Sequence, residues 1–280
     1  MKNKDFFYLQ YNYLQYNKID WKNQEKTKIN FYIYDYIIKN IIRHKKGNNI
    51  AVFDIGFGIG IFLKKLLQDL RRRYQTIIVE GCEPSRLNYK HFLNKNLKGV
   101  RRDITLKTHN KTFLKSLTEA KFDFITAIYV FPHFAFDDTR KVARKIRLML
   151  KEGGKFVLVV ANEKYLENKL KTEQDLFIES RNIALGGKKY REVLHYSDIP
   201  KIGKVIDYNR DESFYIDLFK KNGFALNQKK NINDAGFICT LFVFKKRLHP
   251  TFPKKRILNQ LPPASRARRL SRLFFGRPRV

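Results

Sequence analysis

Three glycines follow a short apolar run, and their spacing points most directly to chemistry. They stand at Gly56, Gly58 and Gly60, just after Asp54, and form the pattern G-x-G-x-G. A strand that turns sharply against a ligand needs residues without Cβ, because the backbone itself approaches the ligand. The pattern therefore predicts a loop that holds a small ligand at the end of a strand.

The residues around these glycines argue against two common phosphate-binding loops. The dinucleotide fingerprint G-x-G-x-x-G needs a third glycine where Ile61 stands. A P-loop needs Lys and then Ser or Thr after its last glycine, but Ile61 and Phe62 follow Gly60. Asp54 also disfavours a nearby pyrophosphate, because like charges repel. A cationic or zwitterionic ligand suits this loop better.

Two more acids stand at the ends of predicted strands. Glu83 follows the apolar run 77–82, and Asp103 lies at the end of the run 99–104. In nucleotide-binding folds a carboxylate after the second strand accepts hydrogen bonds from ribose hydroxyls. Asp103 is expected to accept a hydrogen bond from an adenine amino group, with a turn cap as the alternative.

Strands and helices alternate along the chain, which would bring these residues to one edge of a sheet. Such alternation implies parallel pairing with right-handed crossovers. The strands are expected at residues 50–55, 77–82, 99–104, 122–130 and 155–161, with helices at 61–73, 85–94 and 139–150 between them.

The end of the domain follows a different pattern. After a helix expected at 212–222, two strands at 224–230 and 236–245 are separated only by the short polar turn 231–235. No crossover helix fits there, so this pair must be antiparallel. The sequence therefore predicts an α/β fold, a Rossmann-like seven-stranded, mostly parallel sheet with a C-terminal antiparallel hairpin and helices on both faces.

Four stretches resemble motifs of class I S-adenosylmethionine-dependent methyltransferases. Residues 52–60 resemble the cofactor loop, and Glu-Pro-Ser at 83–85 resembles the acidic motif after the second strand. Residues 122–128 resemble the strand-four motif, and Leu-Lys-Glu-Gly-Gly at 150–154 resembles a Leu-Lys-Pro-Gly-Gly turn, with Glu in place of Pro. Their order and spacing match, as does the closing hairpin. The chain is most similar to ubiquinone-biosynthesis-like and other small-molecule methyltransferases.

The resemblance implies an enzyme that transfers a methyl group from S-adenosylmethionine. His133 follows strand four, where cofactor and acceptor meet in this family, and is the candidate general base. The alternative is a packing or hydrogen-bonding role near the adenosine. Methyl transfer is an in-line displacement that orientation alone can accelerate, so a base is not obligatory. The expected cofactor-binding residues are Asp54, Gly56, Phe57, Gly58, Gly60, Glu83, Pro84, Asp103, Ile104 and Tyr129.

The chain divides into a methyltransferase domain at 47–246 and flanking segments. Residues 1–46 hold an aromatic stretch and an amphipathic helix, and are a candidate lid. The long polar insertion 162–211 is a candidate acceptor-binding lid. Residues 247–280 are Arg-rich without any acid and are expected to be a disordered tail, a basic arm or a read-through extension. The insertion offers these candidate acceptor contacts: Tyr190, Arg191, His195, Tyr196, Asp198 and Arg210.

The charge balance bears on partners. With 58 Lys and Arg against 26 Asp and Glu, the formal net charge is +32, which favours anionic partners. The lysine-, asparagine- and isoleucine-rich composition expected of an AT-rich genome explains the net charge equally well.

A small-molecule acceptor is the leading hypothesis, and an RNA methyltransferase using the basic surface and tail is the alternative. Strand four nevertheless lacks the Asn/Asp-Pro-Pro-Tyr/Phe pattern and the Pro-Cys nucleophile of two common RNA-modifying groups. A non-catalytic member that binds cofactor or a partner is a third hypothesis.

The sequence also gives expectations about the location of the protein and about metal binding. No apolar run has transmembrane length, and the polar N-terminus lacks a secretory signal pattern. Cys82 and Cys239 lie in apolar runs and are expected to be buried free thiols in a reducing cytoplasm. No Cys or His spacing indicates a metal site.

Overall fold

The computed structural model describes most of the predicted domain. The compact unit ends at Arg247. The aromatic stretch, the Arg-rich tail and Asp103 lie outside the described residues, so their predictions are not tested. The described residues are 27–96, 104–199, 203–234 and 237–248.

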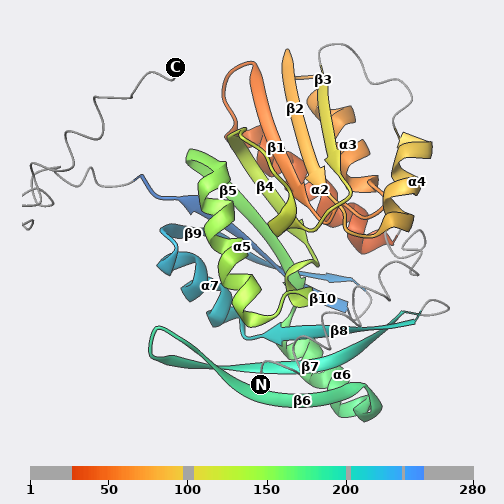
Figure 1. Ribbon diagram of the computed structural model, residues 1–280, viewed down its shortest axis with the longest axis vertical. Coiled ribbons are helices and arrows are strands. Elements are labelled where there is room, and N and C mark those ends of the chain that lie inside the picture. Colours follow the sequence, from red (N-terminus) through yellow and green to blue (C-terminus); the bar gives the residue numbers. More distant parts are fainter. Residues whose placement is uncertain (1–26, 97–103, 200–202, 235–236, 249–280) are drawn as a thin grey trace, which may run out of the picture. The chain divides into compact units, whose positions relative to one another are not determined.

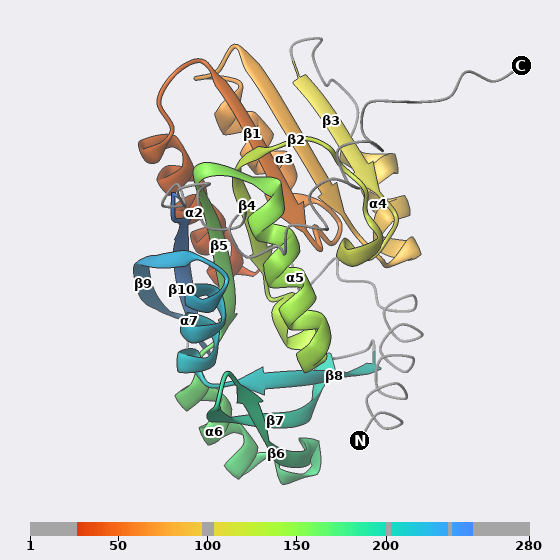
Figure 2. The same ribbon diagram turned by 60° about the vertical axis from the view of Figure 1, so that its left-hand side comes forward.

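Seven strands form one mixed sheet in the order β3-β2-β1-β4-β5-β10-β9 (Figures 1 and 2). β1 pairs in parallel with β2 and β4, whereas β10 runs antiparallel to both β5 and β9. This arrangement confirms the predicted sheet and its C-terminal hairpin. The strands are β1 (Asn49–Ile55), β2 (Thr76–Cys82), β3 (Ile104–His109), β4 (Phe122–Ile128), β5 (Leu150–Ala161), β9 (Phe224–Asp234) and β10 (Phe237–Lys246).

Helices cover both faces of this sheet, as predicted (Figure 1). Side chains alternate along a strand, so β1 sends Val52 into the core under one helix layer and Phe53 into the other. Burial on both faces explains why the parallel strands are continuous apolar runs. One layer holds α2 (Lys28–His44), α3 (Ile61–Leu70) and α4 (Arg86–Asn96), and the other holds α5 (Phe136–Met149) and α7 (Glu212–Lys221).

The carboxyl ends of the central strands meet at one edge. Ile55 of β1 pairs with Cys82 of β2 and with Ala127 of β4. Residues that follow these strands are therefore neighbours, although they are far apart in the chain. A short 3-10 helix, η2 (Phe131–His133), continues from β4, and another, η1 (Phe113–Lys115), follows β3.

The third strand lies further along the chain than predicted. It begins at Ile104, where the predicted strand ends, and Ile104 pairs with Ile77 at the amino end of β2. Five residues at about 3.3 Å each put Ile104 roughly 17 Å from the carboxyl edge. The prediction that strand three ends at Ile104 is therefore wrong, and Ile104 does not belong with the residues of the glycine-loop edge.

The insertion contains regular structure that its polar sequence did not indicate. It forms a three-stranded antiparallel sheet in the order β6-β7-β8, which both figures show beside the lower end of α5. Strand β8 packs against η2. In the described part of the chain, no helix is long and apolar enough to cross a membrane. The insertion comprises α6 (Glu163–Thr172), η3 (Gln174–Leu176), β6 (Phe177–Leu185), β7 (Lys188–Ile199) and β8 (Gly203–Arg210).

Candidate functional site

The glycine loop has the backbone that its sequence predicts. Gly56, Gly58 and Gly60 have φ angles of 66°, 58° and 81°, in the left-handed region that favours glycine. A Cβ on Gly60 would lie 2.2 Å from a ring carbon of Phe92, and one on Gly56 would lie 2.7 Å from a methyl of Val130. Conformation and space both require glycine at these two positions.

Glu83 closes the loop from the neighbouring strand. Its Oε2 accepts a hydrogen bond from Gly58 N at 2.9 Å, and its Oε1 accepts one from Ser85 N at 2.8 Å. The residue is only 4% exposed. The carboxylate is thus fixed beside the loop, as expected for a group that recognises ribose hydroxyls.

Asp54 lies directly beneath the loop, at the end of β1. It is 2% exposed, and its Oδ1 accepts a hydrogen bond of 2.6 Å from the hydroxyl of Thr126 on β4. Gly56 N donates to Cys82 O at 2.8 Å, which ties the start of the loop to β2. The two acids and the glycines therefore form one constellation across three adjacent strands.

Burial makes both acids unusual. It raises the pKa of Asp54 from 3.8 to about 7, against the hydrogen bond from Thr126, and the charge of Glu83 raises it further. Burial likewise raises the pKa of Glu83 from 4.5 to about 7, against hydrogen bonds from Ser85 and Gly58. A ligand with hydrogen-bond donors or positive charge would stabilise the ionised forms.

Tyr129 begins the loop after β4 in a strained conformation. Its φ of 58° makes it the one non-glycine residue with positive φ among the residues described, and such strain often marks functional sites. Burial raises the pKa of its hydroxyl well above the usual value, and Cys239 contributes to this shift. Its ring meets that of Phe237 edge-on, with centroids 6.0 Å apart.

Two other predicted cofactor residues differ in exposure. Phe57 is 4% exposed and packs on Phe92, with ring centroids 4.9 Å apart, so its side chain belongs to the core. Pro84 lines an open cavity of about 670 Å³ beside Glu83. The other residues around this cavity are Arg86, Leu87, Lys90, Asn110, Lys111, Thr112 and Lys115.

Asn110 takes the place where an acid was expected after strand three. It follows the carboxyl end of β3, and its Nδ2 donates to Glu83 O at 2.8 Å. The displaced strand boundary hid it, because the predicted end of the strand pointed to Asp103 instead. An amide offers both a donor and an acceptor to a nucleobase edge.

His133 lies at the end of η2, between the loop edge and the insertion. Its Nδ1 is 2.8 Å from Oδ1 of Asp207 on β8. Its charge also lowers the pKa of Glu83, although burial and hydrogen bonds have larger effects. The histidine therefore contacts the partly buried Asp207 and lies close enough to Glu83 for its charge to act on that carboxyl.

The insertion residues singled out from sequence do not share one surface. His195 pairs with Asp207 across β7 and β8, and its Nε2 contacts Asn209. Tyr190 instead packs against the α7 side and donates to Asp217 at 2.5 Å. The ion pair of Arg191 with Glu167 lies at the surface. Tyr196 and Asp198 also belong to β7.

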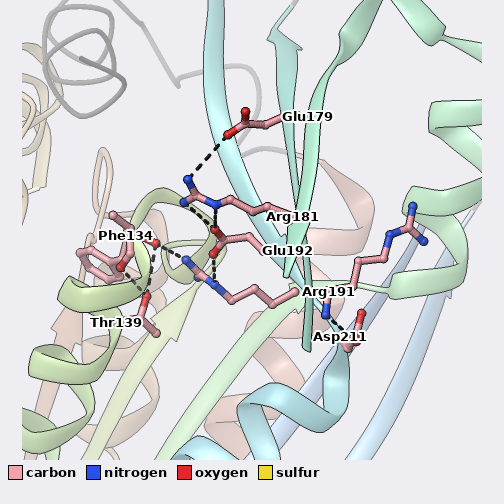
Figure 3. A network of polar contacts seen from close by, with 9 residues as sticks. Phe134, Thr139, Glu179, Arg181, Arg191, Glu192 and Asp211 are labelled. Atoms are coloured by element: carbon pink, nitrogen blue, oxygen red, sulfur yellow. Dashed lines mark hydrogen bonds and ion pairs between the residues drawn. The ribbon is translucent and has the colours of Figure 1, made fainter. Parts of the chain in front are cut away.

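A buried ion network joins the insertion to the turn after η2 (Figure 3). Glu192 is fully buried and accepts 2.6 Å hydrogen bonds from both Arg181 and Arg210. Arg210 also donates to Phe134 O at 2.8 Å. Neither Asp207 nor Glu192 was identified from sequence, because no motif surrounds them. No group of three metal-ligating side chains occurs among the described residues.

Comparison with known proteins identifies the domain. Residues 30–229 match the family described as methyltransferase domain. No curated protein matches the sequence. Many solved structures are similar to this chain at low sequence identity, and that likeness establishes the fold alone.

Three solved structures illustrate this likeness. An S-adenosylmethionine-dependent methyltransferase from Clostridium acetobutylicum is 14% identical with a TM-score of 0.54, over 82% of this chain and 96% of that one. Magnesium protoporphyrin IX methyltransferase from Synechocystis, with bound cofactor, is 10% identical with a TM-score of 0.58, over 85% and 96%. The 1,6-didemethyltoxoflavin methyltransferase of Burkholderia thailandensis is 12% identical with a TM-score of 0.54, over 81% and 82%.

The family match covers more than half of the chain, and it agrees with the strand order and the glycine loop. The acid after β2 stands beside that loop, as the cofactor motif requires. The chain belongs to the methyltransferase domain family and is a class I S-adenosylmethionine-dependent methyltransferase.

Proposed function

We propose that this enzyme methylates a hydroxyl or amine of a small molecule, with His133 as general base. One observation carries the proposal: η2 follows β4 at the glycine-loop edge, and His133 at its end contacts Asp207 of the insertion strand β8. A methyl acceptor bound beside the sulfonium would lie in this region. The proton released on methylation would pass to the imidazole.

In this proposal Glu83 accepts hydrogen bonds from the ribose hydroxyls, and Asp54 complements the positive charge of the methionine part. The backbone of Gly56, Gly58 and Gly60 lets the cofactor approach closely. S-adenosylmethionine supplies an electrophilic methyl group. The protein orients the acceptor for in-line attack and excludes water, which supplies much of the acceleration.

We propose that β7 and β8 line one side of the acceptor-binding site. These strands bring His195 and Asp207 close to His133, at the edge where the cofactor carboxylate lies. The proteins named as methyltransferases of magnesium protoporphyrin IX and of 1,6-didemethyltoxoflavin have a similar fold, which supports a small-molecule acceptor. A lid role for the N-terminal aromatic stretch and a cytoplasmic location remain predictions.

RNA is the second candidate acceptor, and the cavity beside Glu83 favours it. Arg86, Lys90, Lys111 and Lys115 surround that cavity with positive charge. Phosphate groups bind such clusters, and binding weakens steeply with salt. The Arg-rich tail, which lies outside the described residues, would add to this affinity.

Calorimetric titration with S-adenosylhomocysteine tests the cofactor site. We expect binding by the wild type and none by Gly58→Arg, whose side chain would occupy the loop. Lys171→Arg, an exposed change on α6, serves as the control for folding and should bind normally. Failure of the wild type to bind, or full binding by Gly58→Arg, refutes the site.

Methyl transfer is then screened with methyl-labelled S-adenosylmethionine. One arm offers pools of small hydroxyl and amine compounds, and the other offers mixed RNA over a salt series, with full-length protein and with residues 1–247. Label in a small molecule, lost in His133→Asn, supports the proposal. Label confined to RNA overturns the small-molecule assignment.

A further inference from the structure

The insertion supplies a carboxylate to the proposed base. Oδ1 of Asp207 lies 2.8 Å from Nδ1 of His133, and Oδ2 accepts a hydrogen bond of 2.5 Å from Ser197 Oγ. One carboxylate oxygen therefore contacts the ring nitrogen at ion-pair distance, and the other holds a hydrogen bond. The side chains of His133 and Asp207 are only 19% and 14% exposed, so water screens their interaction weakly.

The electrostatics of this pair favour an ionised Asp207. Burial acts to raise the pKa of Asp207, but the charge and hydrogen bond of His133 outweigh it and hold that pKa below the usual value. The charge of His195 and the hydrogen bond from Ser197 act in the same direction. At neutral pH a carboxylate thus faces the ring nitrogen, with Glu83 as the other acid near the histidine.

The backbone next to His133 is held by the same strand. Arg210 of β8 donates from Nη2 to Phe134 O at 2.8 Å, and its Nε is bound to the buried Glu192. Two consecutive residues, 133 and 134, are therefore fixed by β8. The contact between His133 and Asp207 is therefore preorganised, because the backbone next to His133 is held in place by the strand that carries Asp207.

We propose that Asp207 is the positioning residue for His133 during methyl transfer. This rests on the proposed function of His133 as base. Asp207 keeps the proton of the neutral imidazole on Nδ1, so that Nε2 accepts the acceptor's proton. As the acceptor atom bonds to the methyl carbon, the carbon–sulfur bond breaks and its electrons stay on S-adenosylhomocysteine. The imidazolium formed is stabilised by the Asp207 carboxylate and later releases its proton to water.

The ring of His133 reports this contact without any acceptor. The protein has six histidines, and the His133 signal in ¹⁵N spectra is assigned by its loss in His133→Asn. In the wild type we expect the Nδ1–H tautomer when the ring is neutral. In Asp207→Asn the neutral ring should lose this preference and populate both tautomers, because an amide can donate to Nδ1 as well as accept from it.

Kinetics separate positioning from a general structural role. Asp207→Asn should lower kcat about 10–100-fold and leave S-adenosylhomocysteine affinity within about 2-fold, because Asp207 is not among the residues assigned to the cofactor. Introduced into His133→Asn, the same change should cause no further loss, because it acts only through the imidazole. Asp175→Asn, an exposed change of the same chemistry on η3, should leave every readout unchanged.

Each result has one interpretation. An unchanged His133 tautomer in Asp207→Asn, or a full additional loss in the double variant, overturns the positioning role. Ser197→Ala keeps the carboxylate and should leave the Nδ1–H tautomer of His133 in place. If the wild type does not bind S-adenosylhomocysteine, the proposed function itself fails, whereas the tautomer of the ring still decides whether Asp207 controls His133.

Discussion

Replacing Glu83 with glutamine removes a charge that the cofactor-free protein tolerates poorly. Burial is the main reason that the pKa of Glu83 is about 7 in the folded protein, whereas its usual value is 4.5. Between these values the folded state keeps a proton that the unfolded chain has lost. Stability therefore falls as pH rises through this window and is level above it. At about 1.4 kcal/mol per pH unit, the loss is roughly 3 kcal/mol.

Glutamine also has a cost that does not depend on pH. Glu83 accepts hydrogen bonds from Gly58 N and Ser85 N with its two oxygens, and glutamine has only one oxygen. The unmatched N–H costs about 1–3 kcal/mol. This cost cancels when variant and wild type are compared at two pH values. The relative stability of Glu83→Gln should thus improve by about 2–3 kcal/mol from pH 5 to pH 8.

Thermal unfolding measured at pH 5 and pH 8 tests this reasoning. For a chain of this size, 2–3 kcal/mol corresponds to a relative Tm change of roughly 4–9 °C. Removing Glu83 also relieves the charge that raises the pKa of Asp54, which acts in the same direction. Glu119→Gln, an exposed control, should change Tm equally at both pH values. If Glu83→Gln also changed Tm equally at both pH values, the reasoning from a buried charge at Glu83 would be refuted.

Bound cofactor should favour the ionised form of Glu83, which the cofactor-free protein disfavours. Ribose hydroxyls that donate to Glu83 favour its ionised form, so binding near pH 7 should release protons. Calorimetry in two buffers with different ionisation enthalpies measures that release. Glu83→Gln should bind S-adenosylhomocysteine at least about 10-fold more weakly at pH 8 and should release fewer protons near pH 7. Unchanged affinity would contradict the assigned role of the carboxylate.

Three further changes test other parts of the structure. Gly60→Ala should cost about 2–4 kcal/mol in chemical denaturation, because a left-handed alanine also meets a ring; a loss below about 1 kcal/mol would contradict the packing. Thr126→Val removes the donor to Asp54, so its loss of about 1–3 kcal/mol should appear in thermal unfolding at pH 8 and shrink at pH 5. Arg210→Met leaves Glu192 with one arginine and should cost about 3 kcal/mol or more by denaturation; a neutral effect would show that the network is dispensable.

The arrangement of the glycine loop and Glu83 was predictable because each of these parts is local in sequence. The glycines of residues 56–60 have positive φ angles, and the space beside Gly56 and Gly60 is too small for a Cβ, so no other residue fits there. Glu83 directly follows a buried strand, so its place at the carboxyl edge follows from parallel pairing. Such features depend on the sheet alone, which continuous apolar runs indicate strongly.

The third strand was harder to place because it is at the edge of the sheet. Ile104, Leu106 and Thr108 are partly buried, whereas Thr105 and Lys107 between them are exposed. This period-two pattern is typical of a half-buried strand. The expectation of a continuous apolar strand, which suits the centre of the sheet, favoured residues 99–104 instead. Asp103 therefore stood at the end of the predicted strand, whereas Asn110 follows the end of the strand in the structure.

The insertion was missed for a different physical reason, and that reason bears on its function. Tyr190, Glu192 and Leu194 are all buried on β7, so a charge stands where periodicity requires an apolar residue. Glu192 is stable there only because Arg210 and Arg181 neutralise it, and Arg210 comes from the next strand. No local pattern reveals such a pair. The same ion pair that conceals the strand fixes the end of β8 to the turn after His133, so the insertion serves as a rigid support for the histidine.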